Sequence, residues 1–296
     1  MIDANVPARS RIALIGCGLM GSAVGHRLLG LGYPLTVYNR TPGKTASLAS
    51  AGASVRATPQ DAARHAAVVI TVVTDDNVLR AVLYGPRGAL AGTPVAPLVI
   101  DLGTHSPAAI SQIAHEAGVR GASLVEAPVS GSLHDAQRGT LGFLVGAQTD
   151  HLEMARPLLE ALGKSVFHFG LPGTGNSAKL AMNLLVGAMA RGLSEAIAML
   201  DAQQLNVPQF LAALDESGLA SPLYRRIGER HLQGDSSARF SLANLEKDML
   251  LARAQAQALG VSHDIANAVI SRIGQMDAAF KQRDYSALIS WQTRDR

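Results

Sequence analysis

Residues 11–21 read Arg-Ile-Ala-Leu-Ile-Gly-Cys-Gly-Leu-Met-Gly, and this stretch decides the fold. The apolar run Arg11–Ile15 predicts a buried strand, and Gly16-Cys17-Gly18-Leu19-Met20-Gly21 follows it and opens a helix. The three glycines permit a tight turn, close approach of the backbone to a pyrophosphate, and close packing of the helix on the strand. The N–H groups of the helix N-terminus then face the anion. A structural turn is the alternative, but the strand-turn-helix context predicts a dinucleotide site.

Further short apolar runs predict buried parallel strands, separated by alanine-rich helical stretches. They lie at Leu35–Tyr38, Val68–Val73, Leu98–Asp101, Leu124–Ala127, Phe143–Val145 and Val166–Phe169. This alternation predicts an α/β fold with a doubly wound Rossmann sheet. After residues 170–173 only helical periodicity remains, with helix breaks at Asn206–Pro208, Ser221–Pro222, Gly234–Asp235 and Gly260–Val261. We therefore expect a dinucleotide-binding Rossmann domain over residues 1–172 and an all-α substrate and dimerisation domain over residues 173–296.

The composition favours a compact enzyme with small ligands. Of 296 residues, 48% are apolar and 17% are charged, with a formal net charge of +3. A nucleic-acid partner is not expected, because such proteins show clustered basic residues and stacking aromatics, and only 4% of this chain is aromatic. The single cysteine, Cys17, forms no intramolecular disulfide and fits a cytoplasmic protein.

Residues 180–190 are apolar for about three helical turns before Arg191 and Glu195, which predicts a buried helix and no membrane span. The alanine-rich second half, with its long apolar helices, suggests a homodimer or homotetramer. The sequence predicts no metal site.

The end of the second strand indicates which dinucleotide is preferred. An NAD site usually has an acidic residue there, which accepts hydrogen bonds from the ribose hydroxyls. This chain has Asn39-Arg40-Thr41, with Lys44 a turn later. Arg40 can bind a 2′-phosphate through a charged fork, and Thr41 and Lys44 add donors. We expect NADP(H), with NAD(H) as the alternative if Arg40 is only a solvated residue at a strand end.

Residues 173–183 read Gly-Thr-Gly-Asn-Ser-Ala-Lys-Leu-Ala-Met-Asn. The i, i+4 spacing places the Lys179 ammonium and the Asn183 amide on one helical face. One group can protonate an oxygen while the other orients it. Such pairs also occur on ordinary wet helix surfaces, so this spacing alone does not define a site.

Five blocks of sequence together resemble the β-hydroxyacid dehydrogenase family, and they occur in the family's order. The blocks are Gly-x-Gly-x-Met-Gly at residues 16–21, Glu126-Ala127-Pro128-Val129-Ser130-Gly131, Gly139-Thr140-Leu141, residues 173–183 with Lys179 and Asn183, and Lys247-Asp248-Met249. Residues 39–44 and Ser130-Gly131-Ser132 resemble the glyoxylate/succinic semialdehyde reductase branch more than the hydroxyisobutyrate branch.

The resemblance implies hydride transfer between a nicotinamide and the carbon that bears the substrate oxygen. It makes Lys179 the proton donor in aldehyde reduction, which agrees with the negative charge that develops on the carbonyl oxygen. It also implies that Ser130 and Gly131 bind the carboxylate of a small substrate, with Asn183 beside it. Lys247 is expected beside the nicotinamide, and Asp248 is expected to pair within the site.

The family also contacts the dinucleotide through the turns after the third and fourth long strands. The matching residues are Val73, Thr74, Asn77 and Thr104, although a helix-capping role for Thr74 or Asp75 fits equally well. The family usually has serine where this chain has Gly103, so only Thr104 is carried over from this turn. His105, His134 and Arg138 are expected to be structural or to face solvent.

We therefore expect NADPH-dependent reduction of a small aldehyde acid of the glyoxylate or succinic semialdehyde type, or the reverse oxidation. A dehydrogenase of the 3-hydroxyisobutyrate or tartronate semialdehyde type is the alternative. An imine reductase is a minor alternative, because those enzymes generally have another residue in place of Lys179. A non-catalytic dinucleotide sensor is another, but it would be expected to lose Lys179 or Asn183.

Overall fold

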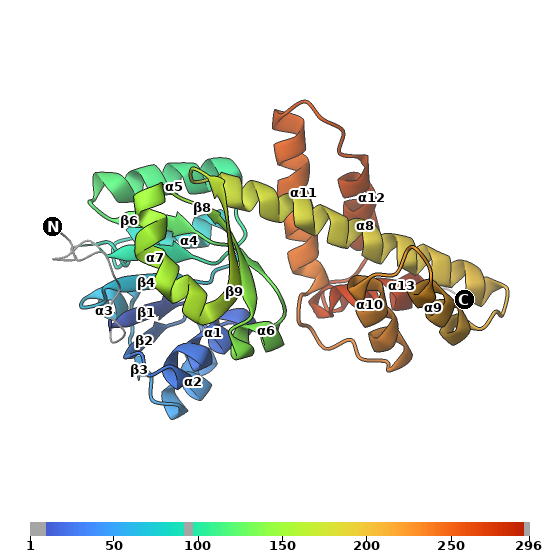
Figure 1. Cartoon of the computed structure of the whole chain (residues 1–296), viewed down its shortest axis with the longest axis horizontal. Coiled ribbons are helices and arrows are strands. Elements are labelled where there is room, and N and C mark those ends of the chain that lie inside the picture. Colours follow the sequence, from blue (N-terminus) through green and yellow to red (C-terminus); the bar gives the residue numbers. More distant parts are fainter. Residues whose placement is uncertain (1–9, 92–96, 293–296) are drawn as a thin grey trace. The chain divides into compact units, whose positions relative to one another are not determined.

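The computed structural model describes residues 10–91 and 97–292, which form two compact units (Figure 1). The first unit ends at Lys179 and the second begins at Leu180. Helix α8 (Thr174–Ala202) begins in the first unit and continues into the second. The predicted domain boundary near residue 172 stays a prediction.

The first unit is built on one sheet. Its strands are β1 (Ile12–Ile15), β2 (Leu35–Tyr38), β3 (Ser54–Val55), β4 (Val68–Thr71), β5 (Leu98–Asp101), β6 (Ser123–Glu126), β7 (Val129–Ser130), β8 (Leu141–Gly146) and β9 (Gly163–Gly170). The strand order is β3-β2-β1-β4-β5-β6-β8-β7, with β9 paired to β8. The chain runs outward from β1 to β3 and then returns to β4 on the other side of β1. Ligands of such sheets bind at the carboxyl ends of the strands beside this switch point.

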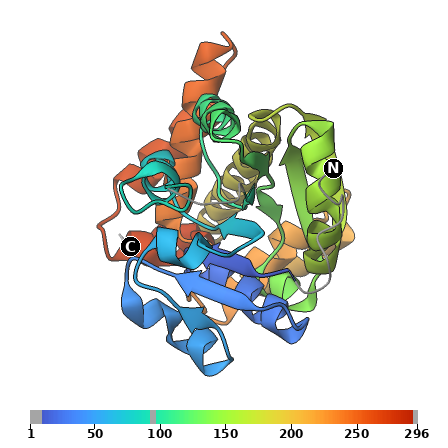
Figure 2. The ribbon, with the colours of Figure 1, turned by 90° about the vertical axis from the view of Figure 1, so that its left-hand side faces the viewer.

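Helices cover both faces of this sheet, which confirms the doubly wound prediction (Figure 2). Ile12 and Leu14 pack on one face with residues of α1 (Leu19–Gly30), α2 (Ala46–Ser50) and α7 (Thr149–Leu162). Ala13 and Ile15 pack on the other with α3 (Pro59–Ala63), α4 (Asp76–Tyr84) and α5 (Pro107–Val119). Because successive side chains of a strand point to opposite faces, β1 is apolar throughout.

Several strand predictions were wrong in detail. Two strands of two residues each, β3 and β7, were missed, because so short an element leaves no apolar period. Strand β8, predicted as parallel, runs antiparallel to β6 and β7 and parallel only to β9. Strand β9 was predicted to be buried, but it pairs with β8 alone, and Phe167 and Phe169 are 54% and 51% exposed.

The described residues of the second unit are helical, as predicted, with one isolated bridge between Ser241 and Asp284. Besides α8, the helices are α9 (Val207–Glu216), α10 (Pro222–Leu232), α11 (Leu242–Ala258), α12 (Asp264–Gly274) and α13 (Leu288–Gln292), with 3-10 turns at Phe280–Gln282 and Tyr285–Ala287. Asn206, Ser221 and Ser241 cap the N-termini of α9, α10 and α11 with their side chains. The core includes Leu193 and Ile197 of α8, Met249 of α11 and Ile273 of α12.

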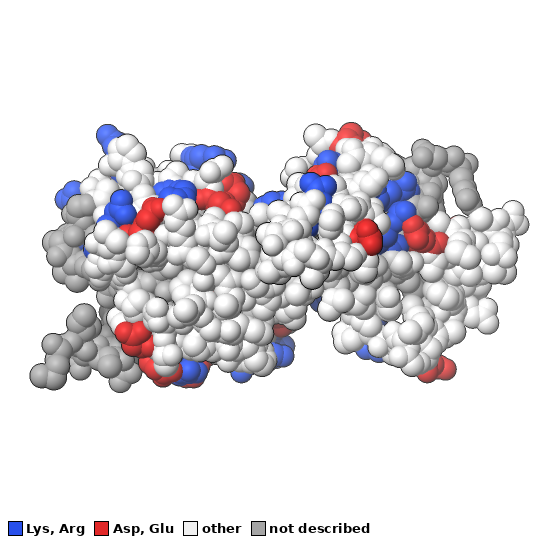
Figure 3. Space-filling view, turned by 90° about the horizontal axis from the view of Figure 1, so that it is seen from above, with Lys and Arg blue, Asp and Glu red and all other residues white. Residues whose placement is uncertain are grey.

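Helix α8 is only partly buried, whereas its apolar run at residues 180–190 predicted a buried helix. Leu180, Ala190 and Leu193 are buried, but Met182 and Leu185 are 43% and 63% exposed. Among the described residues it is the one helix with the length and composition of a membrane span, a weak indication because core helices pass the same test. On the face shown in Figure 3, basic and acidic side chains are interspersed on each unit.

Candidate functional site

The loop after β1 has the geometry that the glycine pattern predicts. Gly16 has φ +99°, and a Cβ there would lie 2.3 Å from the carbonyl oxygen of Val72. A Cβ on Gly21 would lie 1.9 Å from the carbonyl oxygen of Gly16, so α1 can pack this closely on the loop only if residue 21 is glycine. A Cβ on Gly18 would meet no atom within 4 Å, so this backbone is open to a ligand. These are the three separate reasons for glycine at a pyrophosphate site.

The N-terminus of α1 fits an anion. Gly18 is its N-cap and gives no side-chain cap, and the first turn contains no acidic residue. The first N–H groups of a helix have no partner within it and carry partial positive charge. Leu19 is 57% exposed and Met20 is half-buried, so the first turn is accessible. The chain therefore offers backbone donors to the phosphates of a dinucleotide.

The side chain of Asn39, directly after β2, forms hydrogen bonds to the backbone at both ends of its amide. Its Oδ1 accepts from the N–H of Cys17 at 2.9 Å, and its Nδ2 donates to the carbonyl of Thr41 at 2.9 Å. Arg40 and Thr41 are exposed, and so is Lys44 in the 3-10 turn Pro42–Thr45. Within the described chain no carboxylate pairs with Arg40. The loop thus presents a cationic side chain where an NAD site presents an acid.

The turn after β4 shows which residue caps the following helix, and the cofactor contact of Thr74 stays a prediction. Asp75 caps α4, because its Oδ1 accepts from the N–H of Val78 at 2.9 Å. The Thr74 hydroxyl donates to Oδ2 of Asp75 at 3.1 Å and is exposed, as is Asn77. Val73 is half-buried. Asp75 therefore fills the capping role, and Thr74 supports it while remaining open to a ligand.

The turn after β5 contains a buried polar cluster that the sequence did not predict. Asp101 is fully buried and accepts from the Thr71 hydroxyl at 2.5 Å. The His105 ring, also fully buried, lies 3.1 Å from Oδ1 of Asp76 through Nδ1 and 3.2 Å from Oδ2 of Asp101 through Nε2. Nε2 of His105 and Oδ2 of Asp101 are close enough for an ion pair, but they are not aligned for a hydrogen bond. Thr104, between Gly103 and His105, is half-buried.

The segment predicted to bind the substrate carboxylate lies at β7 and the turn after it. Ser130 is the last residue of β7 and is half-buried, and Gly131 is exposed with φ +143°. Ser132 is used elsewhere: its side chain and Asp135 form a capping box at the start of α6 (Leu133–Arg138). Of the two serines, Ser130 is thus the one whose hydroxyl is not committed to capping. His134 and Arg138 are exposed.

The start of α8 is held by Glu126, the last residue of β6. Its Oε1 accepts from the N–H groups of Gly173 and Gly175 at 2.5 and 2.9 Å, and its Oε2 accepts from the N–H and Nδ2 of Asn176 at 3.2 and 2.5 Å. Burial raises the pKa of Glu126, and these four donors offset part of that rise. A carboxylate at a helix N-terminus is stabilising. Lys179, half-buried, follows one turn later.

Glycines permit this close approach of helix and strand. A Cβ on Gly175 would lie 2.4 Å from the carbonyl oxygen of Leu144, and one on Gly146 would lie 1.9 Å from Oε1 of Glu126. Gly175 is therefore required for α8 to begin against β8, whereas a Cβ on Gly173 would meet Ser111 and Pro107 of α5. Glu126 and Asn176 lie within the quoted sequence motifs, but no role was predicted for either. The one signal for a role of Glu126 was its place at the end of a predicted strand, ahead of the Gly-x-Gly at residues 173–175.

In the second unit the structure brings three predicted residues together. Nδ2 of Asn183 donates to Oδ2 of Asp248 at 2.6 Å, and Nζ of Lys247 lies 2.7 Å from Oδ1 of Asp248. Asp248 is 2% exposed, and Lys247 is partly exposed. The buried carboxylate therefore joins α8 to α11 and holds both the amide and the ammonium. This agrees with a supporting role for Asp248.

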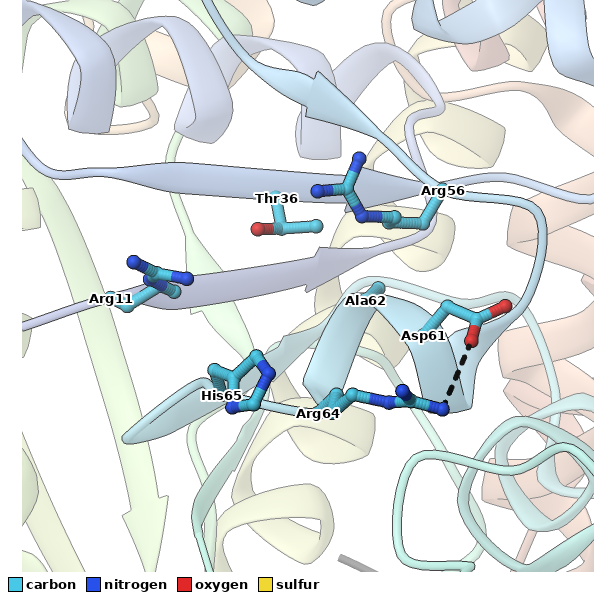
Figure 4. A pocket seen from close by; sticks show the side chains of 7 residues that line it. All are labelled: Arg11, Thr36, Arg56, Asp61, Ala62, Arg64 and His65. Carbon is cyan, nitrogen blue, oxygen red and sulfur yellow. Dashed lines mark ion pairs between the residues drawn. The ribbon is translucent and has the colours of Figure 1, made fainter.

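A pocket of about 250 Å³ lies apart from these residues (Figure 4). Its lining is Arg11, Thr36, Arg56, Asp61, Ala62, Arg64 and His65. Arg64 lies 3.9 Å from Asp61. No predicted site residue lines this pocket, so it is separate from the candidate site.

The doubly wound sheet and the open N-terminus of α1 define a dinucleotide-binding fold. Residues 11–170 match the NAD-binding domain of 6-phosphogluconate dehydrogenase, and residues 173–292 match the model described as NAD-binding of NADP-dependent 3-hydroxyisobutyrate dehydrogenase. The chain belongs to the β-hydroxyacid dehydrogenase family and is an NAD(P)-dependent hydroxyacid dehydrogenase that acts on CH–OH groups.

Relatives differ in the activity that their names give. The chain is 30% identical to 3-hydroxyisobutyrate dehydrogenase of Pseudomonas aeruginosa, over 94% of this chain and 96% of the relative. It is 29% identical to glyoxylate/succinic semialdehyde reductase 2 of Arabidopsis thaliana, over 94% and 78%.

Solved structures share the fold. Mycobacterium tuberculosis 3-hydroxyisobutyrate dehydrogenase with L-serine has a TM-score of 0.85 at 24% identity, over 96% of this chain and 99% of that one. A Streptomyces aurantiacus imine reductase has a TM-score of 0.61 at 21% identity, over 96% and 100%.

Proposed function

We propose that the enzyme reduces a small aldehyde acid, of the glyoxylate or succinic semialdehyde type, to the hydroxy acid with NADPH, with Lys179 as proton donor. The observation that carries this proposal is the anchoring of α8 on Glu126. It holds Lys179 one helical turn from the carboxyl edge of the sheet, where nucleotide ligands of this fold bind. A relative named for this activity is 29% identical over 94% of the chain.

The NADP preference rests on residues 39–44. Asn39 turns its amide to Cys17 and Thr41, so no acid meets the ribose, and Arg40 is exposed without a carboxylate partner among the described residues. A guanidinium binds a phosphate through a charged fork. When bound, the cofactor supplies the hydride. The neighbouring Thr41 and Lys44 are exposed and are proposed to add donors.

Side chains and backbone groups of the chain are proposed to protonate the substrate oxygen and to bind the substrate carboxylate. A positioned ammonium at Lys179 stabilises the charge that develops on the carbonyl oxygen and supplies the proton. In the oxidation direction Lys179 must first be neutral. Ser130 and the backbone at Gly131 are proposed to bind the carboxylate, and Asn183, held by Asp248, to orient the substrate.

Substrate discrimination tests this proposal. NADPH oxidation is followed with glyoxylate, succinic semialdehyde and propanal, which lacks the acid group. We expect propanal to react with kcat/KM lower by at least about 10²-fold, because a site built for a polar group leaves its donors unpaired when the group is absent. Equal efficiency for propanal and succinic semialdehyde would show that Ser130 and Gly131 do not form a carboxylate site.

Oxidation of a 3-hydroxyisobutyrate-type substrate is the second candidate, favoured by the 30% identity to an enzyme of that name. Tartronate semialdehyde is a further candidate substrate, because it also has both a carboxylate and a carbonyl group. Product formation from each hydroxy acid with NADP⁺ and NAD⁺ separates these candidates. An imine reductase is disfavoured by Lys179, and a non-catalytic sensor by the retention of Lys179 and Asn183. A cytoplasmic location and a homodimer or homotetramer stay predictions.

A further inference from the structure

His105 is a buried charged residue that the proposed chemistry does not use. Its ring is fully buried, with Asp76 of α4 on one side at 3.1 Å and Asp101 of β5 on the other at 3.2 Å. Burial by itself lowers the pKa of His105, but the two carboxylates more than offset this and raise the pKa to about 9. The ring is therefore an imidazolium at neutral pH, wedged between two acids.

Gly103 and His105 are fitted to one another. A Cβ on Gly103 would lie 2.3 Å from Nε2 of His105 and 2.9 Å from the carbonyl oxygen of Val73. The imidazole thus fills the space that a side chain at residue 103 would need. This gives a physical reason for glycine at residue 103, where the family usually has serine.

The turn that this ring fills is tied to the start of α8. The N–H of His105 donates to Oδ1 of Asn176 at 2.7 Å, and the N–H of Ser106 donates to Oδ1 of Asp76 at 3.1 Å. Asn176 in turn donates from Nδ2 to Glu126 at 2.5 Å. Residues 103–106 are therefore fixed from α4 and are bonded directly to the first turn of α8. Lys179 lies in the next turn of this helix, three residues after Asn176.

We propose that His105 is a positioning residue for hydride and proton transfer: its imidazolium, held between Asp76 and Asp101 against Gly103, fixes the turn that anchors Asn176 and thereby sets Lys179. The same turn contains Thr104, a proposed cofactor contact, so the same buried cation would fix both this contact and Lys179. This inference rests on the proposed role of Lys179.

The direct test replaces His105 by glutamine, which keeps hydrogen-bonding capacity but removes the charge. We expect His105→Gln to lower kcat by about 10- to 100-fold, because small misplacement of reacting groups has large effects on rate. NADPH binding should change much less than kcat, since the pyrophosphate loop is untouched and only the proposed contact at Thr104 is affected. With NADPH deuterated at the transferred position, the isotope effect on kcat should rise above that of the unmodified enzyme.

Tyr84→Phe is the matched control for lost stability. The Tyr84 hydroxyl donates to the carbonyl of Ile113, a bond between α4 and α5 of the same unit that does not reach α8. This variant should lower the unfolding midpoint while keeping kcat and the isotope effect. A purely structural role for His105 would make His105→Gln behave in the same way as Tyr84→Phe, and the positioning inference would then be wrong.

A second test uses the fit of Gly103 to the ring and does not need His105→Gln to fold. Gly103→Ala alone should lower kcat, because the methyl group meets the imidazole. In a His105→Ala background the added methyl should cause a clearly smaller loss, although the contact with Val73 remains. Equal losses in both backgrounds would contradict the fitted pair.

The outcomes separate this inference from the proposed function. If Lys179→Ala is inactive while His105→Gln keeps the unmodified kcat and isotope effect, only the positioning role is wrong. If Lys179→Ala is fully active, the proposed mechanism fails, and with it the role of His105 in setting Lys179.

Discussion

Asn39 shows how one side chain can connect two loops of the proposed cofactor site. Its amide uses both polar ends on Cys17 and Thr41, which joins the glycine loop to the end of β2. An aspartate at this position could accept the Cys17 N–H but would have no N–H for the Thr41 carbonyl. The residue type therefore fits the loop and leaves Arg40 as the group that faces an incoming ligand.

Arg40→Ala should weaken the preference for NADPH over NADH. Loss of a charged hydrogen-bond partner is worth on the order of 1.5–3 kcal/mol, so kcat/KM with NADPH should fall by about 10- to 150-fold while that with NADH changes little. Steady-state rates with both cofactors measure this. Arg56→Ala, an exposed arginine in the separate pocket, should leave the ratio unchanged. An unmodified enzyme that uses NADH as efficiently as NADPH would remove the basis for the role of Arg40.

At the scale of elements, the strands and helices that position the site were largely predictable. The run at residues 12–15 is apolar at every position because helices cover both faces of the sheet, and that pattern is visible in the sequence. Strand β9 was misjudged because three of the four residues in Val166–Phe169 are apolar, but the strand pairs with β8 alone. The burial of such an edge strand depends on neighbours far along the chain. The direction of β8 is likewise a matter of tertiary pairing.

The anchoring of α8 was not predictable from local sequence. Glu126 is separated from Gly173 by 47 positions, and a glutamate at a strand end has no periodic signal that identifies its distant donors. The glycines at residues 173 and 175 were recognised as a motif, but their contacts appear only in three dimensions: both N–H groups bond Glu126, and Gly175 lies close to Leu144. The fit of Gly103 to His105 was equally unpredictable, because only the structure shows that the His105 ring lies against residue 103.

Glu126→Gln should destabilise the first turn of α8. One end of an amide cannot accept hydrogen bonds, so at least one of the four N–H donors loses its partner, which costs on the order of 1–3 kcal/mol. Urea unfolding at pH 7 measures the loss, and hydrogen exchange at residues 175–179 should quicken. Unchanged stability and exchange would mean that the carboxylate does not hold the helix.

At the scale of the whole molecule, the His105 cluster makes stability depend on pH. The pKa of His105 is raised from 6.5 to about 9 in the folded protein, so its contribution is complete below pH 6.5 and is lost as the pH rises through about 9. Asp76 stays ionised over this range because its pKa is lowered, Asp101 is the second carboxylate against the ring, and Glu126 is a further acid that is linked to the cluster through Asn176. Burial raises the pKa of the Cys17 thiol to about 11, so it stays protonated.

Between pH 6 and pH 9.5 the unmodified protein should therefore lose more stability than His105→Gln, by on the order of 1–3 kcal/mol. Urea unfolding of both proteins at the two pH values gives this difference. The comparison cancels the titration of groups that the two proteins share. A pH dependence that is the same in both would mean that His105 is neutral in the folded state.

The central claim is that Lys179 donates the proton in an NADPH-dependent reduction, and a single-turnover trace of Lys179→Ala tests it most directly. With succinic semialdehyde or the best aldehyde acid found, the hydride-transfer step should slow by about 10²- to 10⁴-fold, the usual effect of removing a positioned proton donor. NADPH affinity and the unfolding midpoint should stay close to those of the unmodified enzyme, and Lys179→Met should behave alike. A folded Lys179→Ala protein that transfers hydride at the unmodified rate would contradict the account.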